Sequence, residues 1–112
     1  MLTRYFLNIS YKGKKFFKTE SPEITFLSAA SYYYKNKLDE AEIEFVSLLK
    51  NKNSLQVEAL LFLGQIRFHR QDFTTASSYL KSYLKGISPS HPNRNEVRNI
   101  IRHCATGLAI QY

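Results

Sequence analysis

Apolar residues recur at helical spacing along most of this chain of 112 residues. Ala41, Phe45 and Leu48, for example, follow the i, i+4, i+7 pattern that gathers side chains on one face of an α-helix. Such patterns predict five helices, over residues of about 22–35, 38–51, 55–69, 73–85 and 95–110. Residues typical of helix ends flank these stretches: Ser21 with Pro22, Ser54, Asp72 and Gly86.

The connections inside two of the helix pairs are very short. They lie around Asn36–Lys37 and around Gln71–Asp72. A short connection makes the two helices that it joins pack antiparallel. The whole chain has only 4 glycines and 3 prolines, which is few for a fold of many strands joined by turns. The sequence therefore predicts a single all-α domain built of antiparallel helix hairpins.

The two predicted hairpins repeat each other. A shift of 35 residues superposes Ala41 on Ala76, which are small residues at matching points of two helices. The same shift relates four further pairs: Ala29 to Gly64, Leu38 to Phe73, Phe45 to Leu80, and Leu48 to Tyr83.

This pattern resembles the tetratricopeptide repeat (TPR), a helix–turn–helix unit with a period of about 34 residues. In that family, small residues mark the points where the first helix (A) and the second helix (B) of a repeat cross closely. Ala29 and Gly64 match the small position of helix A, Tyr32 its aromatic position, and Ala41 and Ala76 the small position of helix B. The chain departs from the family pattern at several positions. Thr25 and Ser28 replace large residues, Arg67 replaces an aromatic residue, and glycine is usual where Asn36 and Gln71 stand.

The resemblance implies a short right-handed solenoid of stacked hairpins. Repeat 1 would cover about 22–53, repeat 2 about 55–88, and a capping helix about 95–110, within a domain of residues 21–112. Residues 1–20 would form an N-terminal arm or an extra helix.

The resemblance also implies a binding site, because the A helices of this family line a concave groove that holds a partner segment. The groove positions of this chain include seven residues: Phe26, Tyr33, Leu61, Gln65, Phe68, Arg98 and Arg102. Arg98 and Arg102 lie four residues apart, so both guanidinium groups could reach one acidic group. The alternatives are that the two arginines are merely solvated and that the apolar residues are buried by a neighbouring segment such as residues 1–20.

The charge of the chain is concentrated at its two ends. The net charge is +7, with five basic residues and one acidic residue in 1–20, and seven basic and two acidic residues in 67–112. Basic ends with interleaved aromatic residues permit a nucleic-acid-binding domain as an alternative function, although a solvated basic surface is the commoner interpretation. We do not expect nucleic acid to be the main partner. The acidic run Asp39, Glu40, Glu42 and Glu44 is expected to be a solvated helix face.

Residues typical of catalysis are missing. The three histidines, His69, His91 and His103, have no partner at metal-ligand spacing, and no glycine-rich phosphate loop occurs. Cys104 is expected to be a small buried apolar residue. We therefore expect no enzyme, no cofactor and no bound metal.

The sequence favours a non-enzymatic module, an adaptor or scaffold, that binds another protein or peptide, including one with an acidic group. A second interpretation is a TPR docking or spacer fragment of a larger OmpA-like cell-envelope protein. One cysteine and no apolar stretch of signal-peptide length favour the cytoplasm, with the periplasm as the location of an envelope fragment. No stretch approaches the ~20 apolar residues of a membrane span. The pattern predicts neither the partner's identity nor the oligomeric state.

Overall fold

The computed structural model describes residues 21–111, with side chains described as far as Leu108, and this part of the chain is all-helical. The helices are α1 (Pro22–Tyr34), α2 (Leu38–Leu48), α3 (Gln56–His69), α4 (Phe73–Lys85) and α5 (Arg94–Gln111). Strands do not occur within residues 21–111. The prediction of an all-α fold is confirmed.

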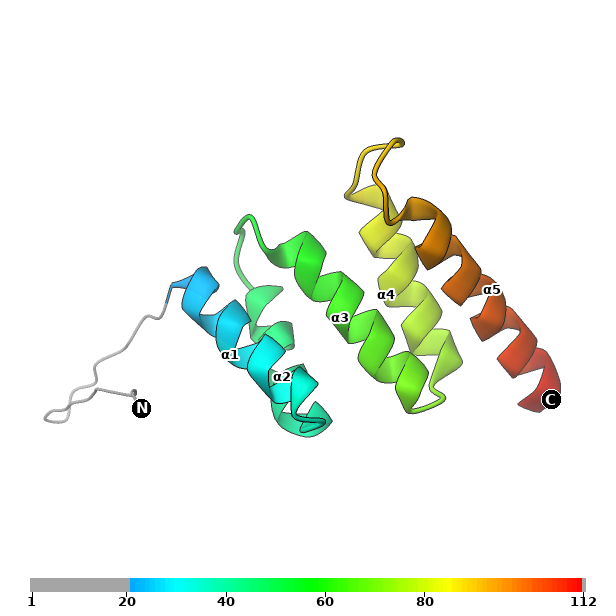
Figure 1. Ribbon diagram of the computed structural model, residues 1–112, viewed down its shortest axis with the longest axis horizontal. Helices are drawn as coiled ribbons and strands as arrows, with labels where there is room; N and C mark the ends of the chain where they lie inside the picture. The colour runs from blue at the N-terminus through cyan, green and yellow to red at the C-terminus, as the bar shows by residue number, and fades with distance from the viewer. Residues whose placement is uncertain (1–20, 112) are drawn as a thin grey trace, which may run out of the picture.

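Consecutive helices pack against each other, α1 with α2, α2 with α3, α3 with α4, and α4 with α5. They alternate in direction, so that α1, α3 and α5 form one layer and α2 and α4 lie behind them (Figure 1). The prediction of antiparallel neighbours therefore agrees with the arrangement. The predicted arm or extra helix at residues 1–20 lies outside the described residues.

Two of the predicted N-caps form the expected hydrogen bonds. The Ser21 hydroxyl accepts from the Ile24 N–H at 3.2 Å, with Pro22 as the first helical residue. The Asp72 carboxylate accepts from the Thr75 N–H at 3.4 Å. These bonds satisfy N–H groups that have no partner within the helix. They explain why α1 and α4 begin where the sequence predicts.

The end of α2 and the start of α3 differ from the prediction. Helix α2 ends at Leu48 and not near residue 51, and Ser54 is not the cap of α3. The Asn53 side-chain amide donates to the Leu48 carbonyl at 2.9 Å, and the Gln56 side-chain amide donates to the Leu49 carbonyl at 3.2 Å. Side-chain amides thus form hydrogen bonds with backbone carbonyls that have no partner at the end of α2, which allows the helix to end earlier than the apolar pattern predicts.

The two short turns have the same backbone geometry. Asn36 and Gln71 are the non-glycine residues with positive φ among residues 21–111, each at 62°. In the first turn the Lys37 N–H donates to the Tyr32 carbonyl at 2.9 Å and the Asn36 N–H to the Tyr33 carbonyl at 3.0 Å. The second turn has the same two bonds 35 residues later, at 2.9 and 3.0 Å. Both helices therefore end in a Schellman motif, in which glycine is the usual left-handed residue.

Replacing Gln71 with glycine is expected to stabilise the protein by about 0.5–1 kcal/mol, because glycine adopts positive φ without steric cost. The gain for Asn36→Gly should be smaller, since asparagine tolerates this conformation better than glutamine. Urea denaturation of the full chain measures both. Lys35→Gly is the matched control. Because φ of Lys35 is −90°, glycine relieves no backbone strain there and should only lower the stability through its greater freedom in the unfolded chain. A less stable Gln71→Gly variant would contradict the proposed turn geometry.

The small residues of the repeat pattern lie in the core. Ala29, Ala41 and Ala76 are fully buried, and Gly64 is buried as well. A Cβ atom built on Gly64 would lie 2.5 Å from Leu80 Cδ2, so α3 and α4 cross too closely there for any side chain. Buried residues from α1, α2 and α3 form one apolar cluster, and residues from α4 and α5 form a second: Leu80, Tyr83 and Val97.

Candidate functional site

Phe26 of α1 lies half-buried where α1, α2 and α3 meet. Its ring makes edge contacts with Phe45, with centroids 5.7 Å apart, and with Phe62, with centroids 5.6 Å apart. Phe62 in turn stacks on Phe45 at 4.7 Å. Phe26 is therefore held by aromatic contacts within the helical array, and the part of its ring that remains exposed has a fixed position.

Tyr33 joins α1 to α3 through polar contacts. Its hydroxyl donates to Gln65 Oε1 at 3.4 Å and lies 3.4 Å from His69 Nε2, while its ring contacts Phe62 at 5.2 Å. Burial, together with the neighbouring Tyr34, raises the pKa of the Tyr33 phenol, so the hydroxyl stays protonated at neutral pH. The sequence pattern predicted Tyr33 and Gln65 but missed His69, because a histidine at a helix end gives no signal of its own.

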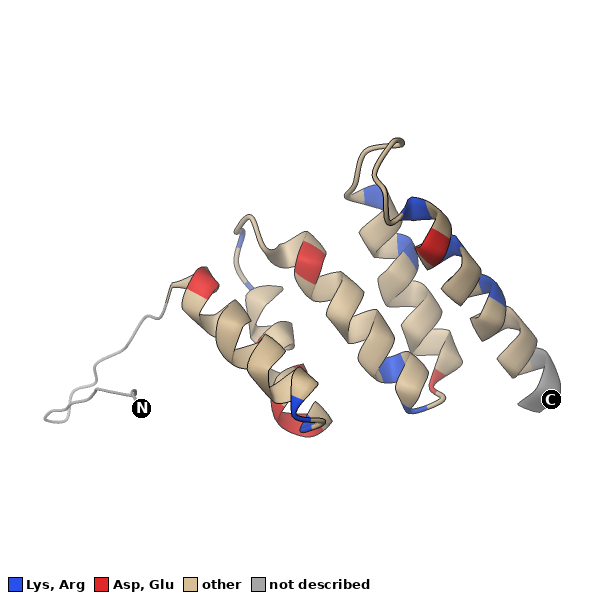
Figure 2. Cartoon of the chain, in the orientation of Figure 1, with Lys and Arg blue, Asp and Glu red and all other residues tan. Residues whose placement is uncertain are grey.

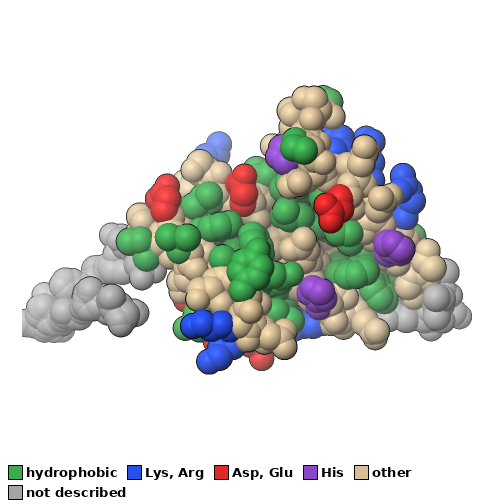
Figure 3. Space-filling model, viewed as in Figure 1, with side chains coloured by type: hydrophobic (Ala, Val, Ile, Leu, Met, Phe, Trp, Pro, Cys, Tyr) green, Lys and Arg blue, Asp and Glu red, His purple; other side chains and the backbone are tan. Residues whose placement is uncertain are grey.

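Phe68 and Leu61 complete this part of the predicted groove. The Phe68 ring lies against Phe73 at 5.6 Å, and Leu61 packs half-buried against the second apolar cluster. We call the surface of Phe26, Tyr33, Leu61, Gln65 and Phe68 the α1–α3 face. In Figure 3, apolar side chains gather over α1 and α3 on the layer that these helices share with α5. Burial of this face by residues 1–20, the alternative interpretation, lies outside the described residues.

The register of α5 follows from its buried residues. Val97 and Cys104 are almost fully buried and lie seven positions apart. Ala59 and Ile66 of α3 are fully buried at the same spacing. Aligning the two pairs relates each residue of α5 to the residue 38 positions earlier in α3, and it also aligns the first residues of the two helices.

This register separates the arginine pair from the α1–α3 face. Arg98 corresponds to Leu60 and Arg102 to Gly64, on the side that α3 turns towards α4. Both arginines are exposed, and the Arg102 guanidinium bonds to Asn99. The prediction that they share one groove with the aromatic residues is therefore not supported. The sequence pattern placed α5 one position out of register, and one position turns a side chain by 100°.

Carboxylates border the same layer of helices. Glu23, Glu58 and Glu96 lie in the first turns of α1, α3 and α5, and all three are exposed. Figure 2 shows acidic residues at the matching ends of these three helices, where they also complement the helix dipoles. The border that the structure gives to this layer is acidic, whereas the sequence analysis expected an arginine pair.

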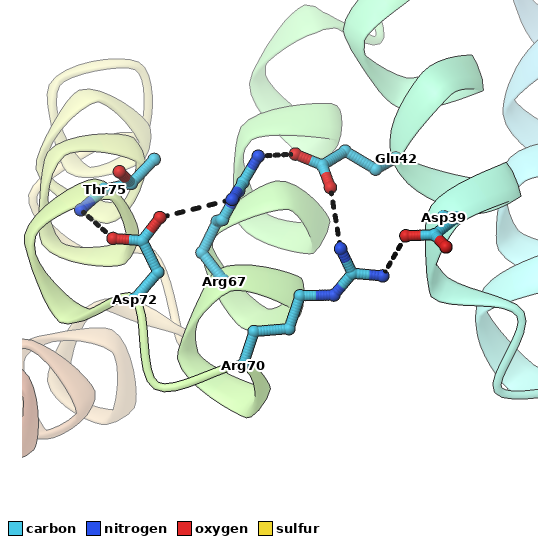
Figure 4. A network of polar contacts seen from close by, with 6 residues as sticks. All are labelled: Asp39, Glu42, Arg67, Arg70, Asp72 and Thr75. Carbon is cyan, nitrogen blue, oxygen red and sulfur yellow. Dashed lines mark hydrogen bonds and ion pairs between the residues drawn. The ribbon is translucent and has the colours of Figure 1, made fainter.

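An ion-pair network connects α2 with α3 and with the start of α4 (Figure 4). Arg67 binds Glu42 and reaches Asp72 at 3.2 Å; Arg70 reaches Asp39 at 2.6 Å and Glu42 at 3.5 Å. Burial alone would lower the pKa of the Arg67 guanidinium, but the hydrogen bond and the charge of Glu42 outweigh it and raise the pKa. The interpretation of the acidic run as a solvated face is therefore wrong for Glu42, whose side chain is 14% exposed, whereas Asp39 is paired but remains 82% exposed.

Replacing Arg67 with methionine is expected to lower the free energy of unfolding by about 1–2 kcal/mol, because a mostly shielded Glu42 loses its nearest cation. The side chains of Arg67 and Glu42 are 32% and 14% exposed, which limits screening by water. Methionine keeps the apolar stem and the helix propensity. Arg102→Met, on an exposed arginine, should change stability by less than ~0.5 kcal/mol. Equal effects of the two substitutions in chemical denaturation would contradict a structural role for the network.

Arg94 has a structural role that the sequence pattern did not indicate. Its guanidinium donates to the carbonyls of Leu84 and Ile87, each at 3.0 Å, and of Ser88 at 3.1 Å. These carbonyls lie in the last turn of α4 and directly after it, where backbone acceptors lack helical partners. Arg94 therefore fixes the turn between α4 and α5 and is not a free cation.

The side chains of residues 21–108 include no group of histidine, cysteine, aspartate or glutamate residues arranged to hold a metal ion. Cys104 is fully buried, and burial raises the pKa of its thiol, so little reactive thiolate forms at neutral pH. None of the described helices is both long enough and apolar enough to cross a membrane.

Comparison with known protein families, curated proteins and solved structures gives no match.

Proposed function

We propose that this chain is a non-enzymatic, TPR-like interaction module that binds a segment of a partner protein on the α1–α3 face. Two observations support the proposal. The repeat pattern at a shift of 35 residues is matched by two Schellman turns at the same shift, at Asn36 and Gln71. The buried small residues lie where helix A and helix B of a TPR would cross.

The α1–α3 face carries the functional part of the proposal. Its rings are held in place by contacts with Phe45, Phe62 and Phe73, so a partner would not have to order them on binding. Gln65 and Tyr33 add an amide and a hydroxyl between these rings, and both groups can bond to a peptide backbone. We therefore expect a partner segment that contributes apolar side chains and leaves its backbone polar groups accessible.

The proposed partner no longer needs an acidic group. That expectation depended on Arg98 and Arg102, which the register of α5 separates from the face. The acidic border of Glu23, Glu58 and Glu96 favours a segment whose ends are neutral or basic. We keep the cytoplasm as the proposed location, with the periplasm as the alternative for an envelope fragment.

Peptide selection tests this proposal and does not require the natural partner to be identified. A random peptide library is panned against the full chain, and the best peptide is titrated by calorimetry. Phe68→Ala should weaken binding more than about tenfold, and Tyr33→Phe, which keeps the ring but loses the hydroxyl, about three- to tenfold. Ser78→Ala on the exposed side of α4 is the control. Selection of no peptide, or equal affinities in all variants, would contradict the proposal.

Nucleic-acid binding has weaker support from the structure. Four of the seven basic residues in 67–112 already have partners: Arg67 and Arg70 in ion pairs, Arg94 on backbone carbonyls, and Arg102 on the Asn99 side chain. Binding to phosphates would fall steeply as the salt concentration rises, whereas binding to the α1–α3 face should fall little. A salt titration of the selected peptide, beside one of a random-sequence oligonucleotide, distinguishes the two.

A further inference from the structure

Helix α1 presents a second apolar surface, on the side opposite its buried Ala29. Ile24, Leu27 and Tyr34 are 54%, 68% and 76% exposed, although all three are large and apolar or aromatic. Together with Ser31 they follow a helical stripe, which we call the outer face of α1. Large exposed apolar groups that share one stripe mark an interaction surface more often than scattered ones do.

The equivalent surface of α3 is an interface between hairpins. A shift of 35 residues relates Leu27 to Phe62, which stacks on Phe45 of α2. The same shift relates Ile24 to Ala59 and Ser31 to Ile66, both fully buried in the cluster that α3 shares with α1 and α2. Helix α1 therefore has the kind of surface that α3 uses to pack on a neighbouring hairpin. It lies at one end of the described array (Figure 1).

The other end of the array does not suit this surface. The side of α5 that faces away from α4 and the core carries polar and basic residues: Asn95, Arg98, Asn99 and Arg102. A head-to-tail contact would place Leu27 and Tyr34 against these groups and leave charges without partners. An open chain of molecules joined end to end is therefore disfavoured.

The outer face of α1 is instead complementary to itself. If two copies of α1 pack antiparallel about a two-fold axis at the level of Ala29, residue i of one copy lies level with residue 58 − i of the other. Ile24 then meets Tyr34 of the second copy, and Leu27 meets the small Ser31. Glu23 lies level with Lys35, so the two exposed charges at the ends of the helix attract each other across the contact.

We propose that the outer face of α1 joins two copies of this chain in a symmetric dimer. One helix pair forms a contact at the small end of specific interfaces, so the dimer dissociates in the micromolar range. Tyr34 links the outer face of α1 to the α1–α3 face, because its ring contacts Tyr33 at 5.2 Å. The other residues of the α1–α3 face are not part of the outer face, and different variants test the two proposals, so they can fail separately.

Sedimentation velocity of the full chain from about 5 to about 500 µM tests the dimer. The weight-average mass should rise from monomer towards dimer. Leu27→Glu should raise the dissociation constant more than about tenfold, because it places two like charges in the contact. Ile43→Glu is the matched control: Ile43 is 70% exposed but lies on α2, so its replacement should leave the dimer unchanged.

Charge reversal tests the antiparallel geometry. Glu23→Lys and Lys35→Glu should each weaken the dimer, and the double variant should restore it, because only an antiparallel pair brings these two positions together. A monomer at all concentrations would overturn the proposal. So would a double variant as weak as the single ones, or equal effects of Leu27→Glu and Ile43→Glu. A monomer whose melting temperature falls with Leu27→Glu would show that residues 1–20 cover the face instead.

Discussion

Replacing Phe45 with alanine is expected to lower the free energy of unfolding by about 3–5 kcal/mol. Phe45 is fully buried, stacks on Phe62 of α3 and contacts Phe26 of α1 by its edge, so one ring joins three helices. Alanine removes these contacts and leaves a cavity that helices on both sides would have to close. A domain of this size has a total stability of about 5–15 kcal/mol, so the variant should be close to unfolding.

Ile43→Ala is the matched control for Phe45→Ala. Ile43 lies on the same helix, two residues away, but 70% of it is exposed, so its loss should cost less than ~0.5 kcal/mol. Urea unfolding followed by circular dichroism measures both variants. If the two substitutions had similar effects, the assigned buried face of α2 would be wrong. The position of the first apolar cluster would then be wrong as well.

Gly64→Val is expected to be the second most damaging substitution, with a loss of about 2–3 kcal/mol. The new Cβ would lie 2.5 Å from Leu80 Cδ2 and 2.6 Å from Leu80 Cγ. Leu80 is fully buried and cannot turn its side chain into water, so α3 and α4 would have to move apart. Valine has a higher helix propensity than glycine. Helix propensity alone would therefore predict that Gly64→Val makes the protein more stable.

The direction in which Gly64→Val changes the free energy of unfolding therefore shows which effect dominates. A decrease indicates the close packing of α3 on α4, and an increase indicates helix propensity. Ser78→Val on the exposed side of α4 is the control, and it should change stability by less than ~0.5 kcal/mol. Thermal and urea unfolding of the two variants supply the comparison. A Gly64→Val protein as stable as the parent would mean that α3 and α4 do not cross at this glycine.

The helices and their pairing could be predicted from the sequence because the signals are local. Ser21 and Asp72 mark helix starts by hydrogen bonds within three residues, and the apolar spacing identifies the buried faces of α2 and α4. The shift of 35 residues predicted which small residues lie in the core. It also pointed to Asn36 and Gln71 as the positions where glycine is usual, and these have positive φ.

The predictions that depended on longer distances were less accurate. The Glu42–Arg67 pair joins residues 25 positions apart, and neither residue signals its partner in the sequence. The early end of α2 depends on Asn53 and Gln56, whose side chains reach back to carbonyls. For α5, apolar residues cover a wide stripe, and the family pattern placed its register one position out, which decided the placement of Arg98 and Arg102.

The most direct test of the proposed binding site is to map the selected peptide onto the chain by NMR. Backbone amide shifts of the ¹⁵N-labelled full chain are followed while the peptide is added. We expect the largest changes at Tyr33, Leu61, Gln65 and Phe68. The amides of Ser47, Ser78 and Lys81, on the other layer of helices, should stay unchanged. Changes concentrated on α2 and α4, or on the arginine side of α5, would contradict the proposed site.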